Sequence, residues 1–461
     1  ARVQKNWKGN TLLGGMVTSV NRALDQPYLE DFMVRNAFTA GIDFTQYFKN
    51  RLYYIDVKGM LSSLHGSAGA ITALQNSVAH YYQRASSADY LGVDPTRRSL
   101  TGTGGYVKVG RKGNAKWNFS ETFTWSSPGF DLNDMGYMKE TDYLMNETEI
   151  MYRQTDIWKI FRYNAFTLSQ KNMWNYGGTP FSNNASLRWQ SMTMNRYEWD
   201  VKETFAWNWL DSRLLRGGPD VRFGSYFLTS AKFNTDKAKR MMFMLKYEGD
   251  HNFEGNRFNT ISPSLTFRLG NHVYLSGQLD YAWNTDEMQY VATTSPLSSS
   301  SLAPYYYVMG HMDQKTYGLT LKLQVNVTPD ISIQFYGAPF TSIAKYDDFK
   351  LAADTKSHTF ENRFQRIDPD QLTYADGVYT IGEGAGQMPF RNPDFRFNEF
   401  RSNLVARWEY LPGSTLYFVW EHRMSNRDNW YSSGWGSNLD RMWGLPATNT
   451  FMIKMNYWFN L

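Results

Sequence analysis

The sequence contains no cysteine among its 461 residues. This absence excludes disulfide bonds and thiolate metal sites, and it is compatible with export through an oxidising compartment. No run of about 18 apolar residues occurs, so a transmembrane helix is not expected. The net charge is only +5, and lysine and arginine are scattered among carboxylates, so nucleic-acid binding has little support.

Aromatic residues, by contrast, are abundant. They make up 17% of the chain, although the mean hydropathy is −0.54. A helical membrane protein would be less polar than this, and a soluble globular protein would normally be less aromatic. Outer-membrane β-barrels combine both properties, because their lumen and loops are polar while Trp, Tyr and Phe gather at the two membrane interfaces.

The last eleven residues, 451–461, alternate in character. Phe451 and Ile453 share a parity with further apolar residues, whereas Lys454 belongs to a largely polar set. Successive side chains of a strand leave opposite faces of a sheet, so this pattern predicts a strand between lipid and water. Residues 317–327 repeat the pattern more clearly.

Strand candidates recur along the whole chain, and the connections between them alternate in length. Short turns such as 49–50 and 270–271 alternate with long polar segments such as 65–98, 286–313 and 342–398. This asymmetry predicts an all-β transmembrane antiparallel barrel of about 18 strands, with short periplasmic turns and long extracellular loops. Residues 1–461 would then form a single barrel domain. The alternative is a soluble β-sandwich or propeller, but outward Trp and Tyr and the lack of a blade-length repeat count against it.

Three segments resemble one known family. Residues 11–22 (TLLGGMVTSVNR), 127–137 (SPGFDLNDMGY) and above all 392–420 (NPDFRFNEFRSNLVARWEYLPGSTLYFVW) are similar to the barrel half of the DUF5916 outer-membrane proteins of Bacteroidota. The resemblance implies a barrel in the bacterial outer membrane. Members usually carry a domain similar to a family 9 carbohydrate-binding module before the barrel, and that domain is absent here. The chain begins at Ala1 without an initiator Met or signal peptide, so we expect a processed or truncated product.

Charged residues with the inward parity are the candidate lining of the lumen. As one interpretation, they form a solute path whose field selects permeants. In the other, facing charges pair across a plugged or narrow interior and hold it together, since a wide barrel needs water or a plug. The predicted lumen-lining residues are Asp43, Asp56, Lys58, Lys108, Arg188, Lys202, Lys246, Arg268, Asp280, Lys322, Arg401, Arg407, Glu409, Glu421, Arg423 and Lys454.

Two long connections are candidates for a plug or cap. Residues 342–398 are too many for simple closure, so we expect either a constriction or docking loop or a cap over the outer mouth. Residues 65–98 are a second candidate, with a short helix expected over 66–75. Aromatic residues of the loops, such as Trp430 and Trp443, could bind a carbohydrate or a protein partner, or could simply pack loop against loop.

Two carboxylates interrupt outward, aromatic-rich faces. Glu121 lies between Trp117 and Trp125, and Glu203 occupies the same place in a second segment of this kind. A Glu facing lipid costs roughly 1–3 kcal/mol. We therefore expect Glu121 or Glu203 to face a protein partner or a local bulge.

No catalytic, cofactor or metal site is predicted. The seven histidines show no HExxH spacing, no GxSxG motif occurs, and no loop has the spacing of an EF-hand. We expect a non-enzymatic outer-membrane barrel, surrounded by outer-membrane lipids, that conducts or translocates a polar solute. The alternative is a plugged accessory subunit that docks a surface lipoprotein or a larger export assembly.

Overall fold

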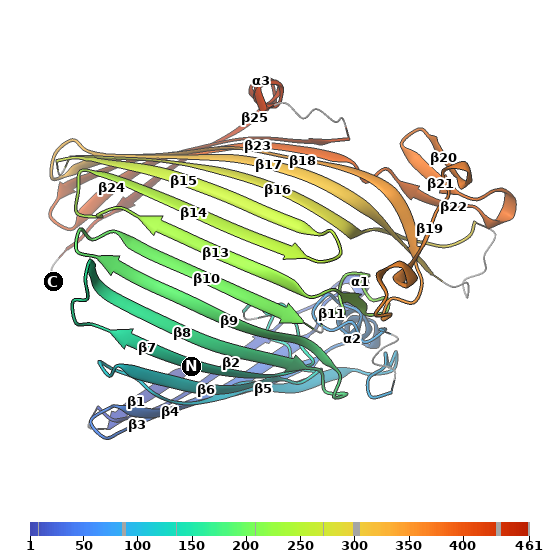
Figure 1. Ribbon diagram of the computed structural model, residues 1–461, viewed down its shortest axis with the longest axis horizontal. Helices are drawn as coiled ribbons and strands as arrows, with labels where there is room; N and C mark the ends of the chain where they lie inside the picture. The colour runs from blue at the N-terminus through green and yellow to red at the C-terminus, as the bar shows by residue number, and fades with distance from the viewer. Residues whose placement is uncertain are drawn as a thin grey trace.

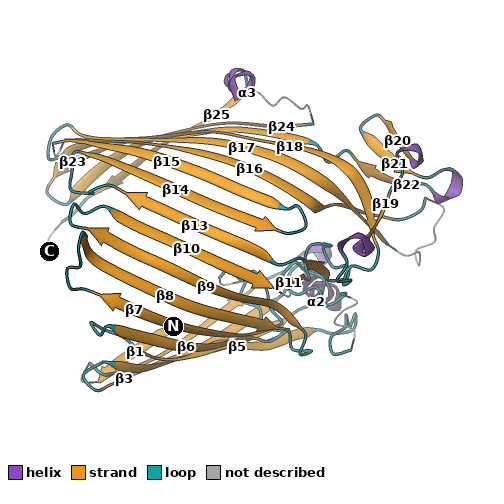
Figure 2. Ribbon diagram, viewed as in Figure 1, coloured by secondary structure: helices purple, strands orange, loops and turns teal. Residues whose placement is uncertain are grey.

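The computed structural model describes residues 1–7, 9–84, 89–134, 136–207, 209–270, 272–297, 305–429 and 435–459. Strands dominate these residues, and they form one large curved sheet (Figure 1, Figure 2). In chain order the strands of the wall are β1 (Arg2–Trp7), β2 (Thr11–Asn21), β3 (Asn36–Phe48), β4 (Tyr53–His65), β5 (Ser99–Arg111), β6 (Trp117–Ser126), β7 (Tyr143–Gln154), β8 (Phe161–Trp174), β9 (Pro180–Thr193), β10 (Glu198–Trp207), β13 (Tyr226–Asn234), β14 (Met241–Asn252), β15 (Arg257–Leu269), β16 (Val273–Thr294), β17 (Tyr306–Asn326), β18 (Ile331–Ala352), β23 (Phe395–Leu411), β24 (Ser414–Asp428) and β25 (Ala447–Asn456).

The wall is an antiparallel meander, as transmembrane β-barrels require. The sheet has 20 strands; one of them, β19 (Phe364–Arg366), pairs only with β18, so 19 strands follow one another in chain order. Within the described residues β1 and β25 are the two edges. Because every neighbouring pair is antiparallel, these two edges run in the same direction. Two edges that run in the same direction cannot pair with each other in an antiparallel wall. Closing the wall therefore needs an odd number of further strands between β25 and β1.

The register shows why this sequence makes a two-faced wall. A single row of cross-strand partners runs through Phe267, Leu275, Leu323, Phe335, Leu404, Trp420 and Phe451. The neighbouring row on the other face contains Lys322, Tyr336, Asn403 and Glu421. Since parity is kept from strand to strand, one face is apolar and the other polar around the wall. The predicted transmembrane antiparallel barrel is confirmed.

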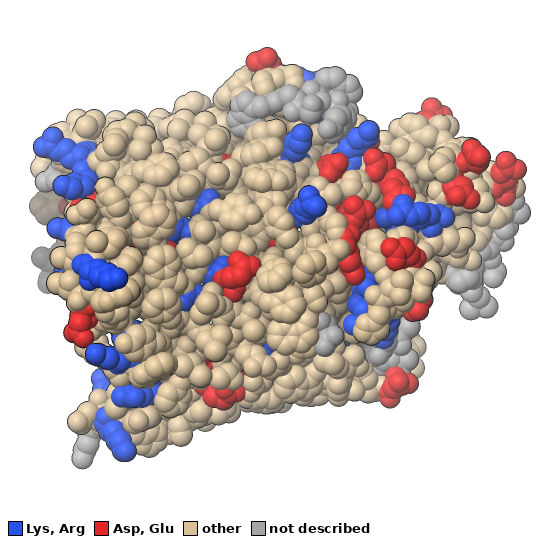
Figure 3. Space-filling model, viewed as in Figure 1, with Lys and Arg blue, Asp and Glu red and all other residues tan. Residues whose placement is uncertain are grey.

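The connections divide the molecule into two different ends. Short turns gather at the left of Figure 1 and long loops at the right. In Figure 3 the wall between them is a broad belt with few charges, Lys and Arg gather at the short-turn end, and most Asp and Glu lie at the long-loop end. No helix in the part of the chain that the structure describes is both long enough and apolar enough to cross a membrane.

The sequence missed one strand, β1. Its outward residues are Val3, Lys5 and Trp7, so a lysine interrupts the apolar parity that marked the other strands. In the structure the Lys5 ammonium lies 5.1 Å from the centre of the Trp7 ring, which keeps this charge at the interface. Every other strand of the wall corresponds to a predicted one.

Residues 342–398, predicted as a loop, are partly strand. Their first part belongs to β18, which continues to Ala352, and their last part begins β23 at Phe395. Likewise β16 and β17 extend into the predicted loop 286–313. Their pairing shifts register near Asp286 and Tyr290. The alternation stops where the strands rise above the membrane, because lipid and water no longer face opposite sides there.

The remaining elements lie in the long connections. They are α1 (Pro27–Glu30), α2 (Ala68–Gln75), β11 (Trp209–Asp211), β12 (Val221–Phe223), η2 (Phe360–Arg363), η3 (Pro369–Gln371), β20 (Leu372–Ala375), β21 (Val378–Ile381), η4 (Gly384–Gly386), β22 (Met388–Arg391) and α3 (Trp435–Trp443). β20, β21 and β22 form a separate small sheet, seen at the far right of Figure 2. The helix expected over 66–75 is confirmed as α2.

Candidate functional site

All sixteen residues predicted to line the lumen lie on the polar face of the wall. The register connects them directly in places: Asp43 is opposite Lys58, Asp56 is opposite Lys108, and Arg401 is opposite Arg423. Their role in a solute path stays a prediction. They share one face because side chains alternate along each strand and directly paired residues of neighbouring strands lie on the same face.

Many of these charges have partners on the same face. Arg188 Nε donates to Asp200 Oδ1 at 2.7 Å, and Lys246 Nζ lies 2.7 Å from Glu248 Oε1. Glu399 Oε1 lies within 2.9 Å of both Arg401 and Arg423. These pairs join neighbours on one strand or on adjacent strands, so the pairing of charges across a plugged or narrow interior stays a prediction.

Other inward cations have no ion-pair partner within the described residues. They are Lys108, Lys202, Lys322 and Lys454, which lie on four different strands. Unpaired ammonium groups keep their hydration and their field in a water-filled space. The polar face thus combines closed ion pairs with free positive charge.

A hollow of about 560 Å³ opens on the polar face of β7–β10 and β13–β15. Its charged lining comprises Glu147, Lys171, Lys202, Glu248 and Asp250, and Ser, Thr and Asn side chains complete it. Both signs of charge and several hydroxyl groups converge here. Such a lining can hold a hydrated polar solute by hydrogen bonds without a single strong anchor.

Helix α2 packs against the polar side of the wall, at its long-loop end. Ser67 caps its N-terminus by accepting a hydrogen bond from the Ala70 backbone nitrogen. Ile71 is fully buried in a cluster with Ala37, Leu64 and Leu100, which have the inward parity of their strands. The predicted plug or cap at residues 65–98 therefore has a hydrophobic anchor inside the wall.

A second connection, residues 127–142, folds onto the same inner surface. A Cβ atom on Gly102 would lie 2.1 Å from the Phe130 backbone nitrogen, so only glycine leaves room for this approach. The backbone nitrogen of Asp131 donates to Ser62 Oγ at 2.8 Å. Ser62 and Gly102 are directly opposite each other on β4 and β5 and point inward. This loop therefore lines the inside of the wall.

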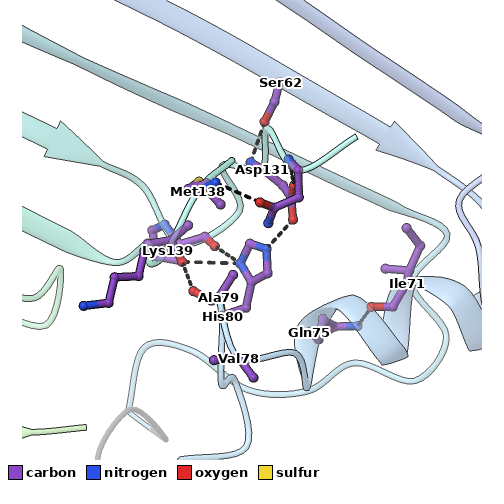
Figure 4. Close-up of polar contacts among 12 residues, drawn as sticks. Ser62, Ile71, Gln75, Val78, Ala79, His80, Asp131, Met138 and Lys139 are labelled. Atoms are coloured by element: carbon purple, nitrogen blue, oxygen red, sulfur yellow. Dashed lines mark hydrogen bonds and ion pairs between the residues drawn. The ribbon is translucent and has the colours of Figure 1, made fainter. Parts of the chain in front are cut away.

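His80 joins the two folded connections (Figure 4). Its Nε2 lies 2.9 Å from Asp131 Oδ2, and its Nδ1 lies 2.8 Å from the carbonyl oxygen of Pro128. Both ring nitrogens are thus engaged, and the side chain is fully buried. His80 is therefore a structural histidine that links the two connections.

Asp142 links a third connection, the one between β8 and β9, to the two folded connections. It accepts hydrogen bonds from Arg84 at 2.8 Å, from the Tyr90 hydroxyl at 2.6 Å and from the Tyr176 backbone nitrogen at 3.1 Å. Burial and the bond to Asp142 raise the pKa of Tyr90. Burial also raises the pKa of Tyr82 to about 12, so both phenols stay neutral donors at physiological pH. We call residues 65–84, 89–98, 127–134 and 136–142 the loop cap.

The other side of the long-loop end is held by Arg363. Its guanidinium is 1% exposed and lies 2.8 Å from Glu254, while it also donates to the carbonyl oxygens of Arg222 and Ser357 at 2.8 Å. Three segments distant in sequence, around residues 222, 254 and 357–363, meet at this one side chain. No signal in the sequence distinguished Arg363 from exposed arginines.

Glu121 and Glu203 point to the apolar side of the wall, as predicted. Glu121 Oε2 accepts a hydrogen bond from Thr148 at 2.6 Å, and its other oxygen is bonded to Asn146. Glu203 accepts from Thr229 at 2.7 Å. Neighbouring strands thus supply donors that lower the cost of each carboxylate. Contact with a protein partner stays a prediction.

Other predicted features lie elsewhere. Trp430 is outside the described residues, whereas Trp443 packs on Phe400, with 4.8 Å between the ring centres. Asp348, on β18, contacts Lys350 and Arg366. Among the described residues no three His, Asp or Glu side chains gather as a metal ion would require.

Several inward residues were missed by the sequence analysis. Asp200, Glu248 and Glu399 have the same parity as their predicted neighbours Lys202, Lys246 and Arg401, so counting by two along each strand would have found them. The loop residues His80 and Asp131 had no such signal.

Comparisons with known proteins find one matching family and several solved structures of distant similarity. The siderophore receptor PirA from Acinetobacter baumannii is 9% identical, with a TM-score of 0.40 over 98% of this chain and 74% of the receptor. A mutant of the ferric enterobactin receptor PfeA from Pseudomonas aeruginosa is also 9% identical, with a TM-score of 0.43 over 97% of this chain and 72% of the receptor. At such values the similarity supports no functional conclusion. No curated protein matches the sequence.

One family model covers most of the chain. It is described as "Domain of unknown function (DUF5916)" and matches residues 62–461, from near the end of β4 to the end of the sequence. The chain therefore belongs to the DUF5916 family.

Proposed function

We propose that this protein is a non-enzymatic barrel of the bacterial outer membrane that lets a polar solute pass along its inner wall. The observation that carries the proposal is the hollow of mixed charge on the polar face, with the loop cap packed onto the same face at the long-loop end. The loop cap controls access from outside, and the charged residues set which solutes enter.

The charges fit this role in two ways. Closed pairs such as Arg188 with Asp200 shape the wall, whereas unpaired lysines such as Lys202 attract anionic groups of a solute. A low-dielectric wall around a polar lumen strengthens such fields. We therefore expect a preference for anionic or zwitterionic solutes.

Conductance and reversal potential in planar bilayers test this function. The double substitution Lys171→Glu and Lys202→Glu reverses two charges in the hollow, so the reversal potential under a salt gradient should shift toward cation selectivity. Lys315→Glu is the matched control, because Lys315 has the outward parity and is exposed. A barrel that never conducts, or a shift of equal size in the control, would contradict a solute path.

A plugged accessory subunit is the second candidate. It is favoured by the tight packing of the loop cap, in which His80 is fully buried. In this role the barrel would dock a surface lipoprotein or an export assembly through its aromatic loops, with a carbohydrate as an alternative ligand. Deleting residues 353–394 separates the two: a barrel that stays sealed but loses a co-purifying protein supports the accessory role.

A further inference from the structure

One sector of the outer wall is polar where lipid contact is expected. On β6–β10 the outward residues Trp125, Trp174 and Trp207 lie toward the long-loop end, and Trp117 and Trp199 lie toward the short-turn end. Aromatic girdles of this kind mark the two interfaces of a membrane. Five outward polar residues lie between these girdles, and Asn183 lies directly opposite Trp207. We call these six residues the polar strip: Glu121, Asn146, Thr148, Gln170, Asn172 and Asn183.

The polar strip is continuous across four strands. Glu121 is opposite Thr148, which is opposite Gln170. In the next row toward the long loops, Asn146 is opposite Asn172, which is opposite Asn183. Direct cross-strand neighbours on one face touch each other. The six side chains therefore form one surface, two rows deep.

Only three of the six side chains in the polar strip have hydrogen-bond partners within the described part of the chain. Glu121 accepts from Thr148 at 2.6 Å and from Asn146. The carboxamides of Gln170, Asn172 and Asn183 have no hydrogen-bond partner among the described residues, and Gln170 is exposed. An unpaired carboxamide in hydrocarbon is strongly unfavourable, because lipid tails offer neither donors nor acceptors.

Strands farther along the wall differ from this sector. β15, β16 and β17 present Leu265, Leu275, Leu279 and Leu321 to the outside. No Asn, Gln or Glu lies among the outward residues 275–279 and 319–323 of those strands. The middle of β16 and β17 therefore forms an apolar outer wall, in contrast to the sector around β8.

We propose that a second copy of this chain packs against the polar strip, with Gln170 of β8 at the centre of the contact. Two barrels of equal orientation are related by a two-fold axis along the membrane normal. A residue on this axis meets its own equivalent, and residues beside the axis meet partners at the same depth. Convex walls touch along a narrow band of strands, and β7 to β9 form the middle of this sector. Carboxamides each carry a donor and an acceptor, so Gln170, Asn172 and Asn183 can pair with themselves.

The pattern of hydrogen bonds within the polar strip favours a second copy over a cationic partner. A basic partner would seek the carboxylate of Glu121, but neighbouring donors already bind both of its oxygens. The groups left over are carboxamides, which need both a donor and an acceptor, and the same groups on a second copy supply both. The proposal is independent of conduction, since a sealed barrel and an open one present the same outer wall.

Cysteine cross-linking tests the contact, and the lack of native cysteine makes single-cysteine variants clean reporters. Gln170→Cys on β8 and, as matched control, Leu321→Cys on β17 both place a thiol on the outer wall, but only Gln170 belongs to the polar strip. After oxidation in proteoliposomes of the pure protein, Gln170→Cys should form a covalent dimer and Leu321→Cys should stay monomeric. Equal cross-linking of both variants, or none at Gln170→Cys, would overturn the proposal.

A second measurement does not depend on disulfide geometry. The double substitution Gln170→Leu and Asn172→Leu makes the strip suited to lipid, so the barrel should fold, which heat-modifiable electrophoretic mobility verifies. Sedimentation in detergent should show dimerisation weakened about tenfold or more. If the wild-type protein sediments as a monomer, or if native membranes yield a cross-link only to a different protein, a second copy is not the occupant.

Discussion

His80 and Asp131 lie 51 residues apart in sequence, yet their side chains meet at 2.9 Å and are almost completely buried. Each comes from a different long connection, and each also touches the inner wall or its neighbour: Asp131 through Ser62, His80 through Pro128. This pair therefore fastens one part of the loop cap to the other, inside the barrel.

Removing the carboxylate should loosen the loop cap. Asp131→Ala leaves a ring nitrogen of buried His80 without its partner, which should cost about 1–3 kcal/mol of local stability. Hydrogen exchange in residues 76–84 and 127–134 should accelerate accordingly, while the strands of the wall should be unaffected. Asp89→Ala, a change at another aspartate of this loop, is the control. Unchanged exchange at both sites would contradict the role of the pair.

A methyl group at Gly102 should expel the loop from the wall. Its Cβ would lie 2.1 Å from the Phe130 backbone nitrogen, which no rotamer change can relieve. Gly102→Ala should expose residues 127–134 to protease and, if the barrel conducts, raise its conductance. Gly92→Ala is the matched control, because its Cβ would meet nothing within 4 Å. Equal protease sensitivity of the two variants would show that the loop is held in another way.

Arg363 should be the costliest arginine to remove at the long-loop end. Arg363→Ala leaves the Glu254 carboxylate without its main partner and three carbonyl groups without a donor, so we expect a loss of about 3–5 kcal/mol in local stability. Arg363→Lys should restore little of this stability, because lysine lacks the planar guanidinium group with its several fixed donors. Arg366→Ala, whose side chain is 59% exposed, should cost less than about 1 kcal/mol. Hydrogen exchange of residues 353–366 measures the loss of local stability in all three variants. Similar losses in Arg363→Ala and Arg366→Ala would contradict the proposed role of Arg363.

Acidification should tighten the attachment of the small sheet β20–β22. Burial raises the pKa of Asp394, whose carboxylate accepts a hydrogen bond from the Tyr346 backbone nitrogen at 2.7 Å. A raised carboxyl pKa means that the folded state favours the protonated form. Stability is therefore greatest below the unfolded value of 3.8 and falls as the pH rises through the folded pKa.

The measurement is the protease resistance of residues 372–391 as a function of pH. Asp394→Asn keeps an acceptor for Tyr346 but cannot titrate, so its resistance should change less with pH than that of the wild type. A profile identical to the wild type would assign the pH dependence to another group.

The wall was predictable because strand parity is local information. Lys322 and Leu323 are adjacent, and the sequence alone shows that one faces water and the other lipid. The same reasoning failed at β1, where Lys5 breaks the apolar set, and at the extensions of β16, β17 and β18. Beyond the membrane both faces of a strand meet water or protein, so the pattern that marks a strand disappears.

The polar strip illustrates the boundary between the two kinds of information. Parity showed that Glu121 faces outward, but its neighbours Asn146 and Thr148 come from a strand more than twenty residues away, so only the register revealed its donors. Gln170, Asn172 and Asn183 are unremarkable along the chain and form one surface only when three strands align.

By itself, the sequence determined a barrel wall with an apolar and a polar face, because each residue's side of the sheet depends only on its position in its own strand. Tertiary structure decided what the loops do inside that wall. His80 meets Asp131, and Phe130 rests on Gly102, through the folding back of long connections, and such contacts depend on which distant surfaces fit together rather than on any local period.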